Sequence, residues 1–180
     1  MLSFRMKIVF VMCVGALAGA LHLYYPFLVG GGYDIIEKSL NFSPSLNVLI
    51  IVFIIRFILG MSSYATGVPG GIFAPMLALG TLIGIMAFSF FSYTLNNINI
   101  HPGMFAVAGM GALFAAAVRA PITGIVLVVE MTQNYMLILP LMITCLTATA
   151  LVQFAKNPPI YMQLLDRIVK RPLKSKIDQI

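Results

Sequence analysis

The long interior of this chain carries almost no charge, and this constrains its fold more than any other feature. Between Lys38 and Lys156 only three side chains are formally charged, namely Arg56, Arg119 and Glu130. Over the whole sequence 61% of residues are hydrophobic and 9% are charged, whereas a soluble domain has roughly 25% charged residues. The sequence therefore predicts an all-α polytopic membrane protein in a lipid bilayer and excludes a water-soluble monomer.

The basic residues gather at the two ends of the sequence. Six of the eleven Lys and Arg residues lie in the last 25 positions, and Arg5 and Lys7 precede the first apolar run. Cytoplasmic flanks of membrane helices carry an excess of Lys and Arg. We therefore expect two cytoplasmic termini, a membrane domain over residues 1–170 and a short basic cytoplasmic tail over residues 171–180. The same layout argues against a nucleic-acid partner.

Gly and Pro divide the apolar sequence into segments of unequal length. The predicted helices cover residues 8–28, 46–64, 73–95, 103–118, 121–132, 137–154 and 160–170. Several are too short to cross a bilayer core of roughly 30 Å. Irregular backbone at membrane depth is tolerated only where it is buried in protein or lines a polar cavity. Long tilted helices combined with short broken ones therefore point to a transport pathway.

Small residues recur at the spacing of closely packed helices. The pairs Gly15 and Gly19, and Gly80 and Gly84, are each four residues apart, and residues 108–112 read Ala-Gly-Met-Gly-Ala. This spacing lets two helix backbones approach each other in a membrane. We expect close helix packing within one subunit at these positions.

A helix start after two glycines is the most informative motif in the chain. Positions 70 and 71 are glycines, and Pro75 falls in the first turn of the helix expected from Phe73, where its missing N–H is tolerated. The amides of Ile72 and Phe73 then lack intrahelical partners at a helix end that carries about +0.5 charge. Such an end can bind an anion through backbone alone. From spacing alone, an anion site and a structural helix break both remain open.

A second candidate residue is Tyr161, which follows Pro158 and Pro159 near another expected helix start. Its hydroxyl can donate a hydrogen bond to an anion, or the ring can serve as an interfacial anchor. The remaining reactive side chains are few and scattered: Cys13, Cys145, His22, His101 and five carboxylates. We therefore expect no enzyme activity, no metal site and no cofactor.

Six strings in this sequence closely resemble the ClC family of chloride channels and proton-coupled chloride transporters, the bacterial members above all. They are Gly-Ile-Phe-Ala-Pro at 71–75, Met-Leu-Ala-Leu-Gly at 76–80, Ala-Gly-Met-Gly-Ala-Leu at 108–113, Arg-Ala-Pro-Ile-Thr-Gly-Ile at 119–125, Val-Glu-Met-Thr at 129–132 and Asn-Tyr-Met-Leu-Ile-Leu-Pro at 134–140. Their order is intact, and the resemblance covers essentially the whole chain.

The resemblance implies a fold and a chloride site. Members of the family are built from two inverted-topology halves, and this chain resembles the second, C-terminal half. In the family the Gly-Ile-Phe-Ala-Pro loop is one wall of the selectivity filter. By residue match, the amides of Ile72 and Phe73 and the hydroxyl of Tyr161 would coordinate a dehydrated chloride ion. The chloride-binding residues expected here are Gly71, Ile72, Phe73, Ala74, Pro75 and Tyr161.

The family's first half supplies elements that this sequence lacks. A Gly-Ser-Gly-Ile-Pro loop completes the central chloride site in the family, and a Gly-Arg-Glu-Gly-Pro loop carries the gating glutamate; neither string occurs here. The internal proton-transfer glutamate of the exchangers also belongs to the first half. Two hypotheses follow: the chain supplies its share of a chloride channel or H+/Cl− exchanger, or it is a truncated or split half-protein without transport unless an N-terminal half joins it.

The three interior charges have competing interpretations. Glu130 is either a structural residue near a helix end or paired with a buried partner, or a residue that gives water or protons access to the site. Arg56 and Arg119 are more typical of helix-end residues or partners of backbone carbonyls than of pore-lining cations. Channel and exchanger remain open alternatives at this point.

The resemblance also implies partners and a location. In the family, helices matching residues 121–132 and 137–154 lie at a homodimer interface, so we expect a homodimer through residues 121–154 in the complete protein. The surface expected to face the second subunit comprises Ile122, Ile125, Leu137, Ile138, Leu141 and Ile143. Resemblance to bacterial members implies a location in the inner cell membrane.

Overall fold

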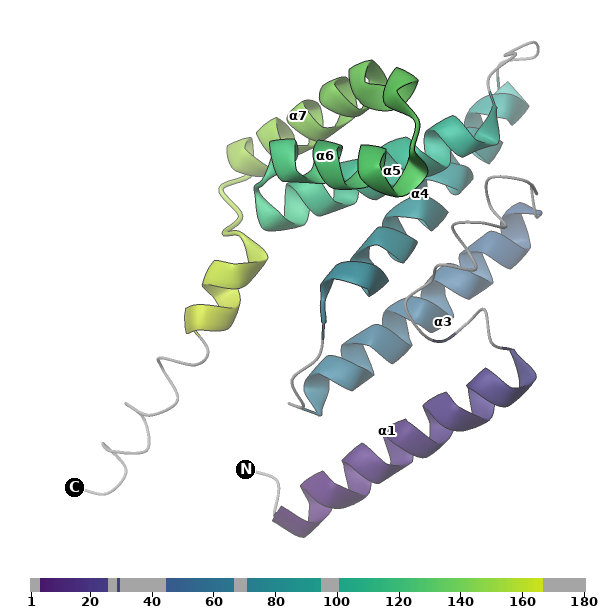
Figure 1. The fold of residues 1–180 in the computed structure, drawn as a ribbon. Coiled ribbons are helices and arrows are strands. Elements are labelled where there is room, and N and C mark those ends of the chain that lie inside the picture. Colours follow the sequence, from purple (N-terminus) through teal and green to yellow (C-terminus); the bar gives the residue numbers. More distant parts are fainter. Residues whose placement is uncertain (1–3, 26–28, 30–44, 67–70, 95–100, 167–180) are drawn as a thin grey trace. The chain divides into compact units, whose positions relative to one another are not determined.

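The computed structural model describes residues 4–25, 29, 45–66, 71–94 and 101–166 (Figure 1). These residues form α-helices and one 3-10 helix, and none of them forms a strand. The helices are α1 (Phe4–Tyr24), α3 (Leu46–Ala65), α4 (Phe73–Thr94), α5 (Pro102–Val118), α6 (Pro121–Thr132), η2 (Tyr135–Leu137) and α7 (Ile138–Phe154). A further helical stretch covers residues 160–166.

The predicted helices agree closely with these bounds. The first is displaced: it was expected over residues 8–28 but begins at Phe4 and ends at Tyr24. The expected tail over residues 171–180 lies outside the described residues. The chain divides into two compact units, Met1–Met110 and Gly111–Ile180, and the division falls within α5.

In the first unit, α3 contacts both α1 and α4 (Figure 1). The hydrophobic cluster at its centre joins α3, α4 and the start of α5 through Leu49, Val52, Leu82, Ile85 and Ala106. A close crossing between α4 and α5 adjoins this cluster. A β-carbon added at Gly80 would lie 2.6 Å from the carbonyl oxygen of Gly109, so the two backbones are in direct contact.

The two glycine pairs expected at packing positions behave differently. Gly80 and Gly84 both face the α5 backbone, as their spacing predicts. At Gly15 and Gly19 an added β-carbon would meet no described atom within 4 Å. Among the described residues, the pair on α1 therefore forms no close helix crossing.

In the second unit, α6 packs against α7. Gly111, in the second half of α5, lies against α7. A β-carbon added at Gly111 would be 2.8 Å from Cδ2 of Leu141 and 3.0 Å from Sγ of Cys145. Gly124 of α6 lies against the ring of Phe114 in the same way, at 3.0 Å. Small residues thus let the three helices of this unit approach closely.

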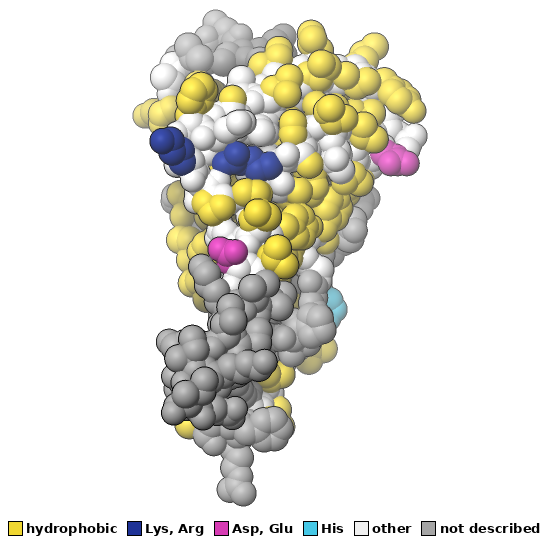
Figure 2. Space-filling view, turned by 90° about the vertical axis from the view of Figure 1, so that its left-hand side faces the viewer, with side chains coloured by type: hydrophobic (Ala, Val, Ile, Leu, Met, Phe, Trp, Pro, Cys, Tyr) yellow, Lys and Arg dark blue, Asp and Glu magenta, His cyan; other side chains and the backbone are white. Residues whose placement is uncertain are grey.

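Three helical stretches are long and apolar enough to cross a membrane: Leu46–Ala65, Phe73–Thr94 and Tyr135–Phe154. Shorter apolar helices cover Ile8–Tyr24, Pro102–Val118 and Pro121–Thr132. Among the described side chains on the face shown in Figure 2, hydrophobic ones predominate and few are charged. The prediction of a polytopic helical membrane protein with long and short helices is confirmed.

Several Ser and Thr hydroxyl groups within the helices donate to a carbonyl of their own helix. Thr81, for example, is fully buried and donates to the carbonyl of Leu77 at 3.0 Å. Six further hydroxyls donate to the carbonyl four residues before them, namely those of Ser89, Thr94, Thr132, Thr144, Thr147 and Thr149. Such pairing removes the cost of an unpaired polar group in an apolar environment.

The α-helices α5, α6 and α7 are each followed within two residues by a residue other than glycine in the left-handed region. Arg119 follows α5 with φ 65°, Gln133 follows α6 with φ 51°, and Lys156 lies two residues after α7 with φ 53°. Glycine is the usual residue at such positions because a β-carbon is strained there.

Candidate functional site

The loop at residues 71–75 leads directly into α4. Ile72 caps the helix with its carbonyl, which accepts a hydrogen bond from the amide of Met76 at 3.3 Å. Pro75 is the third residue of α4, where a missing N–H leaves no intrahelical bond unmade. The predicted helix start is therefore confirmed, and Ile72 and Phe73 lie at its positive end.

The surroundings of this loop differ along its length. Residues 72–75 are half-buried, whereas Gly71 is exposed. A β-carbon at Gly71 would meet no described atom within 4 Å, and its φ lies outside the left-handed region. Within the described residues neither steric crowding nor backbone geometry requires glycine here, so this position leaves the adjoining backbone open to approach.

Tyr64 fixes the loop from the preceding helix. Its hydroxyl donates to the carbonyl oxygen of Gly71 at 3.0 Å, joining the end of α3 to the start of α4. Sequence reasoning missed this contact. The sequence does not predict it, because the seven-residue spacing from Tyr64 to Gly71 crosses a Gly- and Pro-containing segment that shows no helical pattern.

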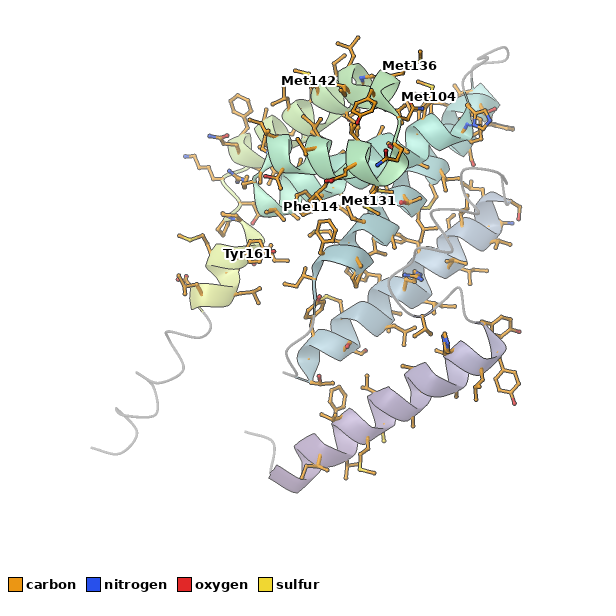
Figure 3. The ribbon with its side chains drawn as sticks, in the orientation of Figure 1. Met104, Phe114, Met131, Met136, Met142 and Tyr161 are labelled. Carbon is orange, nitrogen blue, oxygen red and sulfur yellow. The ribbon has the colours of Figure 1, made fainter. Side chains whose placement is uncertain are left out.

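Tyr161 lies in the helical stretch 160–166, which follows Pro158 and Pro159 (Figure 3). The carbonyl of Pro159 opens this helix by accepting from the amides of Met162 at 3.0 Å and Gln163 at 3.2 Å. The Tyr161 side chain is 55% exposed. The helix start expected near Tyr161 is therefore confirmed. The loop and Tyr161 belong to different compact units, so the geometry of each stands alone.

Glu130 is exposed and lies in the last turn of α6, which ends at Thr132. The side-chain amide of Gln133 donates to its backbone carbonyl at 2.7 Å. These observations agree with the structural interpretation in which Glu130 stands near a helix end. They do not agree with a carboxylate buried within this chain.

Both interior arginines donate to backbone carbonyls, as expected. Nη2 of Arg56, a buried residue of α3, donates to the carbonyl of Val29 at 3.3 Å. Nη2 of Arg119 donates to the carbonyl of Val152 at 3.1 Å and to that of Asn157. A cation beside a carbonyl at the end of a helix such as α7 is favoured by the negative partial charge there.

The surface expected to face a second subunit needs one correction. Ile122, Ile138 and Ile143 are exposed as expected, and Ile125 is half-buried. Leu137 and Leu141 are buried within the chain itself, and Leu141 packs toward Gly111 of α5. The expectation placed Leu137 and Leu141 on the surface with the other four residues, whereas α7 turns the side that carries Leu141 inward to α5.

No group of three or more His, Cys, Asp or Glu side chains that could hold a metal ion occurs within the part of the chain that the structure describes. The polar groups that stand out in the described segments belong to the backbone. They are the helix start after Gly71, the helix start after Pro159, and the carbonyls that accept hydrogen bonds from Arg56 and Arg119.

Comparisons with known proteins point in one direction. Residues 2–153 match the family described as voltage gated chloride channel. The chain is 52% identical over 158 residues to the H(+)/Cl(-) exchange transporter ClcA of Vibrio vulnificus. It is 49% identical over 159 residues to the protein of the same name from Klebsiella pneumoniae. Each alignment covers 88% of this chain and 34% of the relative, so the chain spans about a third of the relatives' length.

A solved structure agrees with these relatives. The X-ray crystal structure of a slow cyanobacterial Cl−/H+ antiporter matches with a TM-score of 0.79 and 39% identity. The match covers 88% of this chain and 37% of that chain.

Proposed function

This chain belongs to the family of voltage gated chloride channels, and from that premise we propose that it forms part of a protein that exchanges chloride for protons across a membrane. The observation that carries the proposal is the identity of about half over 88% of the chain with relatives named as H(+)/Cl(-) exchange transporters. These names favour an exchanger over a channel. They describe transporters, which agrees with the expectation that the protein is not an enzyme.

Within that function, we assign chloride binding to residues 71–75 and to Tyr161. The backbone at Ile72 and Phe73 lies at the start of α4, where the helix carries partial positive charge. The open space at Gly71 would let an anion approach this backbone. Tyr161 stands near a second helix start and would offer one O–H donor.

The assignment is tested by chloride binding to the protein at its natural length. Tyr161→Phe removes one donor, and an ester in place of the amide at Phe73 removes another. Each change should weaken chloride binding about tenfold or more, since a hydrogen bond to a charged group contributes about 1.5–3 kcal/mol. Calorimetric titration with chloride measures this. Tyr135→Phe is the matched control, because Tyr135 is also an exposed tyrosine. Unchanged affinity in both variants would refute the assignment.

A second candidate is that this chain transports nothing until it is joined by an N-terminal half. The coverage of only about a third of the relatives' length favours it. Chloride efflux from liposomes that contain this 180-residue chain alone separates the two candidates. Efflux above that of empty liposomes would contradict the second one.

We further propose that the complete protein forms a homodimer in the inner cell membrane, with both termini cytoplasmic. Exposed apolar side chains of α6 and α7 support the interface, namely Ile122, Val126, Leu139, Met142, Ile143 and Leu146. Packing between such surfaces in lipid depends on shape, because lipid is as apolar as the protein. Bulk added at this interface should therefore separate the subunits.

Ile143→Trp is expected to shift the purified protein from dimer to monomer. The change adds bulk but no charge, so it costs little where the residue contacts lipid and overpacks a protein interface. Ile51→Trp on α3 is the control, since Ile51 and Ile143 are 57% and 59% exposed. Light scattering coupled to size-exclusion chromatography reports the mass. The proposal fails if the two variants have the same oligomeric state.

A further inference from the structure

Arg119 occupies a position that glycine normally fills. It directly follows α5, with φ 65°, and its amide donates to the carbonyl of Ala115 at 3.0 Å. A left-handed conformation is strained for an L-residue, because its β-carbon approaches the following carbonyl oxygen. A strained residue persists when its side chain makes contacts that offset the strain.

The contacts of the Arg119 side chain converge on the turn after α7. Lys156 donates from its amide to the carbonyl of Gln153 at 3.0 Å, and Asn157 donates to that of Val152 at 3.5 Å. With Lys156 left-handed, this pair of bonds is a Schellman motif. Nη2 of Arg119 donates to the carbonyls of Val152 and Asn157. The guanidinium therefore binds the turn at both of its ends.

Arg119 is half-buried, and its Nε is buried without a hydrogen-bond partner in the described structure. A charged group in an environment of low polarity interacts more strongly with the partners it has. The two carbonyls of the turn are those partners. Loss of the guanidinium would therefore remove one bond from each carbonyl and leave that of Val152 only the bond from the Asn157 amide.

The chain between this turn and Tyr161 is stiff. Pro158 and Pro159 each have a fixed φ, and the residue before a proline is restricted to extended conformations. The carbonyl of Pro159 then starts the helix of Tyr161, and Nε2 of Gln163 donates back to the carbonyl of Pro158 at 2.8 Å. The backbone between Asn157 and Tyr161 therefore has few accessible conformations, so the orientation of the Asn157 carbonyl restricts the position of Tyr161.

We propose that Arg119 is a positioning residue for Tyr161: it holds the turn after α7 and so sets where the Tyr161 hydroxyl lies. The predicted effect of Arg119 on chloride affinity rests on the proposed role of Tyr161 in chloride binding. The predicted effect of Arg119 on the position of Tyr161 does not depend on that role.

The test places a single 3-fluorotyrosine at position 161 of the protein at its natural length and records its fluorine NMR spectrum in nanodiscs. Arg119→Met should split or broaden the single wild-type resonance, because the turn loses both bonds. Arg119→Lys should retain a single resonance, since one cationic nitrogen makes both bonds. Lys156→Gln is the matched control: it removes a positive charge from the same turn at another left-handed residue whose side chain is exposed.

A double-mutant cycle with chloride binding gives the second readout. Arg119→Met should weaken chloride binding about tenfold, as expected for one lost hydrogen bond to an ion. In the Tyr161→Phe background the same change should have no further effect, because Arg119 acts through the Tyr161 hydroxyl. A role in overall stability alone would lower affinity equally in both backgrounds.

The outcomes separate this inference from the function it rests on. If Tyr161→Phe leaves chloride binding unchanged, the proposed chloride site fails, and the fluorine spectra still decide the dependence on Arg119. If Tyr161→Phe weakens binding but Arg119→Met matches wild type in spectrum and affinity, the inference is overturned. It is also overturned if Lys156→Gln perturbs the spectrum as Arg119→Met does. Should Arg119→Met not accumulate, Arg119→Gln, which keeps one N–H donor group, is judged by the same criteria.

Discussion

Replacing Gly84 by alanine is expected to lower the free energy of unfolding by about 3 kcal/mol, at the upper end of the usual cost of overpacking. The added β-carbon would lie 2.0 Å from the carbonyl oxygen of Phe105 and 2.7 Å from its carbonyl carbon. These atoms belong to the α5 backbone, so no change of side-chain rotamer relieves the clash. The two helices must separate, and the cluster around Leu82 and Ile85 must open with them.

Two further glycine variants serve as comparisons for the loss of stability in Gly84→Ala. Gly19→Ala is the matched control, because Gly15 and Gly19 repeat the spacing of Gly80 and Gly84 without a described neighbour. Gly111→Ala should fall between the two, since its β-carbon would meet side-chain atoms, which can move. Thermal unfolding in detergent measures all three. Equal melting temperatures for Gly84→Ala and Gly19→Ala would show that the crossing contributes no stability.

Replacing Arg56 by glutamate is expected to cost about 3–5 kcal/mol, the range for changes that leave an uncompensated charge buried. Arg56 is 7% exposed on α3, and its Nη2 donates to the carbonyl of Val29. A carboxylate at this place would present oxygen to a carbonyl oxygen and would itself be desolvated. Both effects act against folding.

The same position allows a graded series. Arg56→Lys keeps the positive charge and should retain most of the stability, whereas Arg56→Glu reverses the charge and should lose the most. Yield of folded protein after membrane extraction and the melting temperature report the order. Equal melting temperatures for Arg56→Glu and Arg56→Lys would mean that the positive charge at position 56 does not contribute to stability.

Much of the fold was predictable because its determinants are local. Apolar runs bounded by Gly, Pro and polar turns predict the helices to within a few residues, apart from the first. Which glycines meet another helix was not predictable, since Gly15 and Gly80 stand in the same sequence pattern and differ only in what lies opposite them. The inward turn of Leu137 and Leu141 escaped prediction for the same reason.

For the candidate site, the sequence predicts the two helix starts but not the contacts that hold them. The Tyr64 hydroxyl on Gly71 and the Arg119 guanidinium on the turn after α7 each join segments through a backbone carbonyl. A carbonyl is present at every residue, so the acceptor leaves no trace in the sequence. Only the donors, Tyr64 and Arg119, are visible there, and neither reveals its partner.

The hydroxyls that donate to carbonyls of their own helix have a consequence for how this protein is made. Thr81, Thr144 and Thr149 each find a partner one turn earlier in the same helix. These groups are therefore satisfied as soon as the helix exists, before any neighbouring helix has arrived. A segment leaving the insertion machinery carries no unpaired hydroxyl at these positions into the hydrocarbon, so its entry does not depend on the order of assembly.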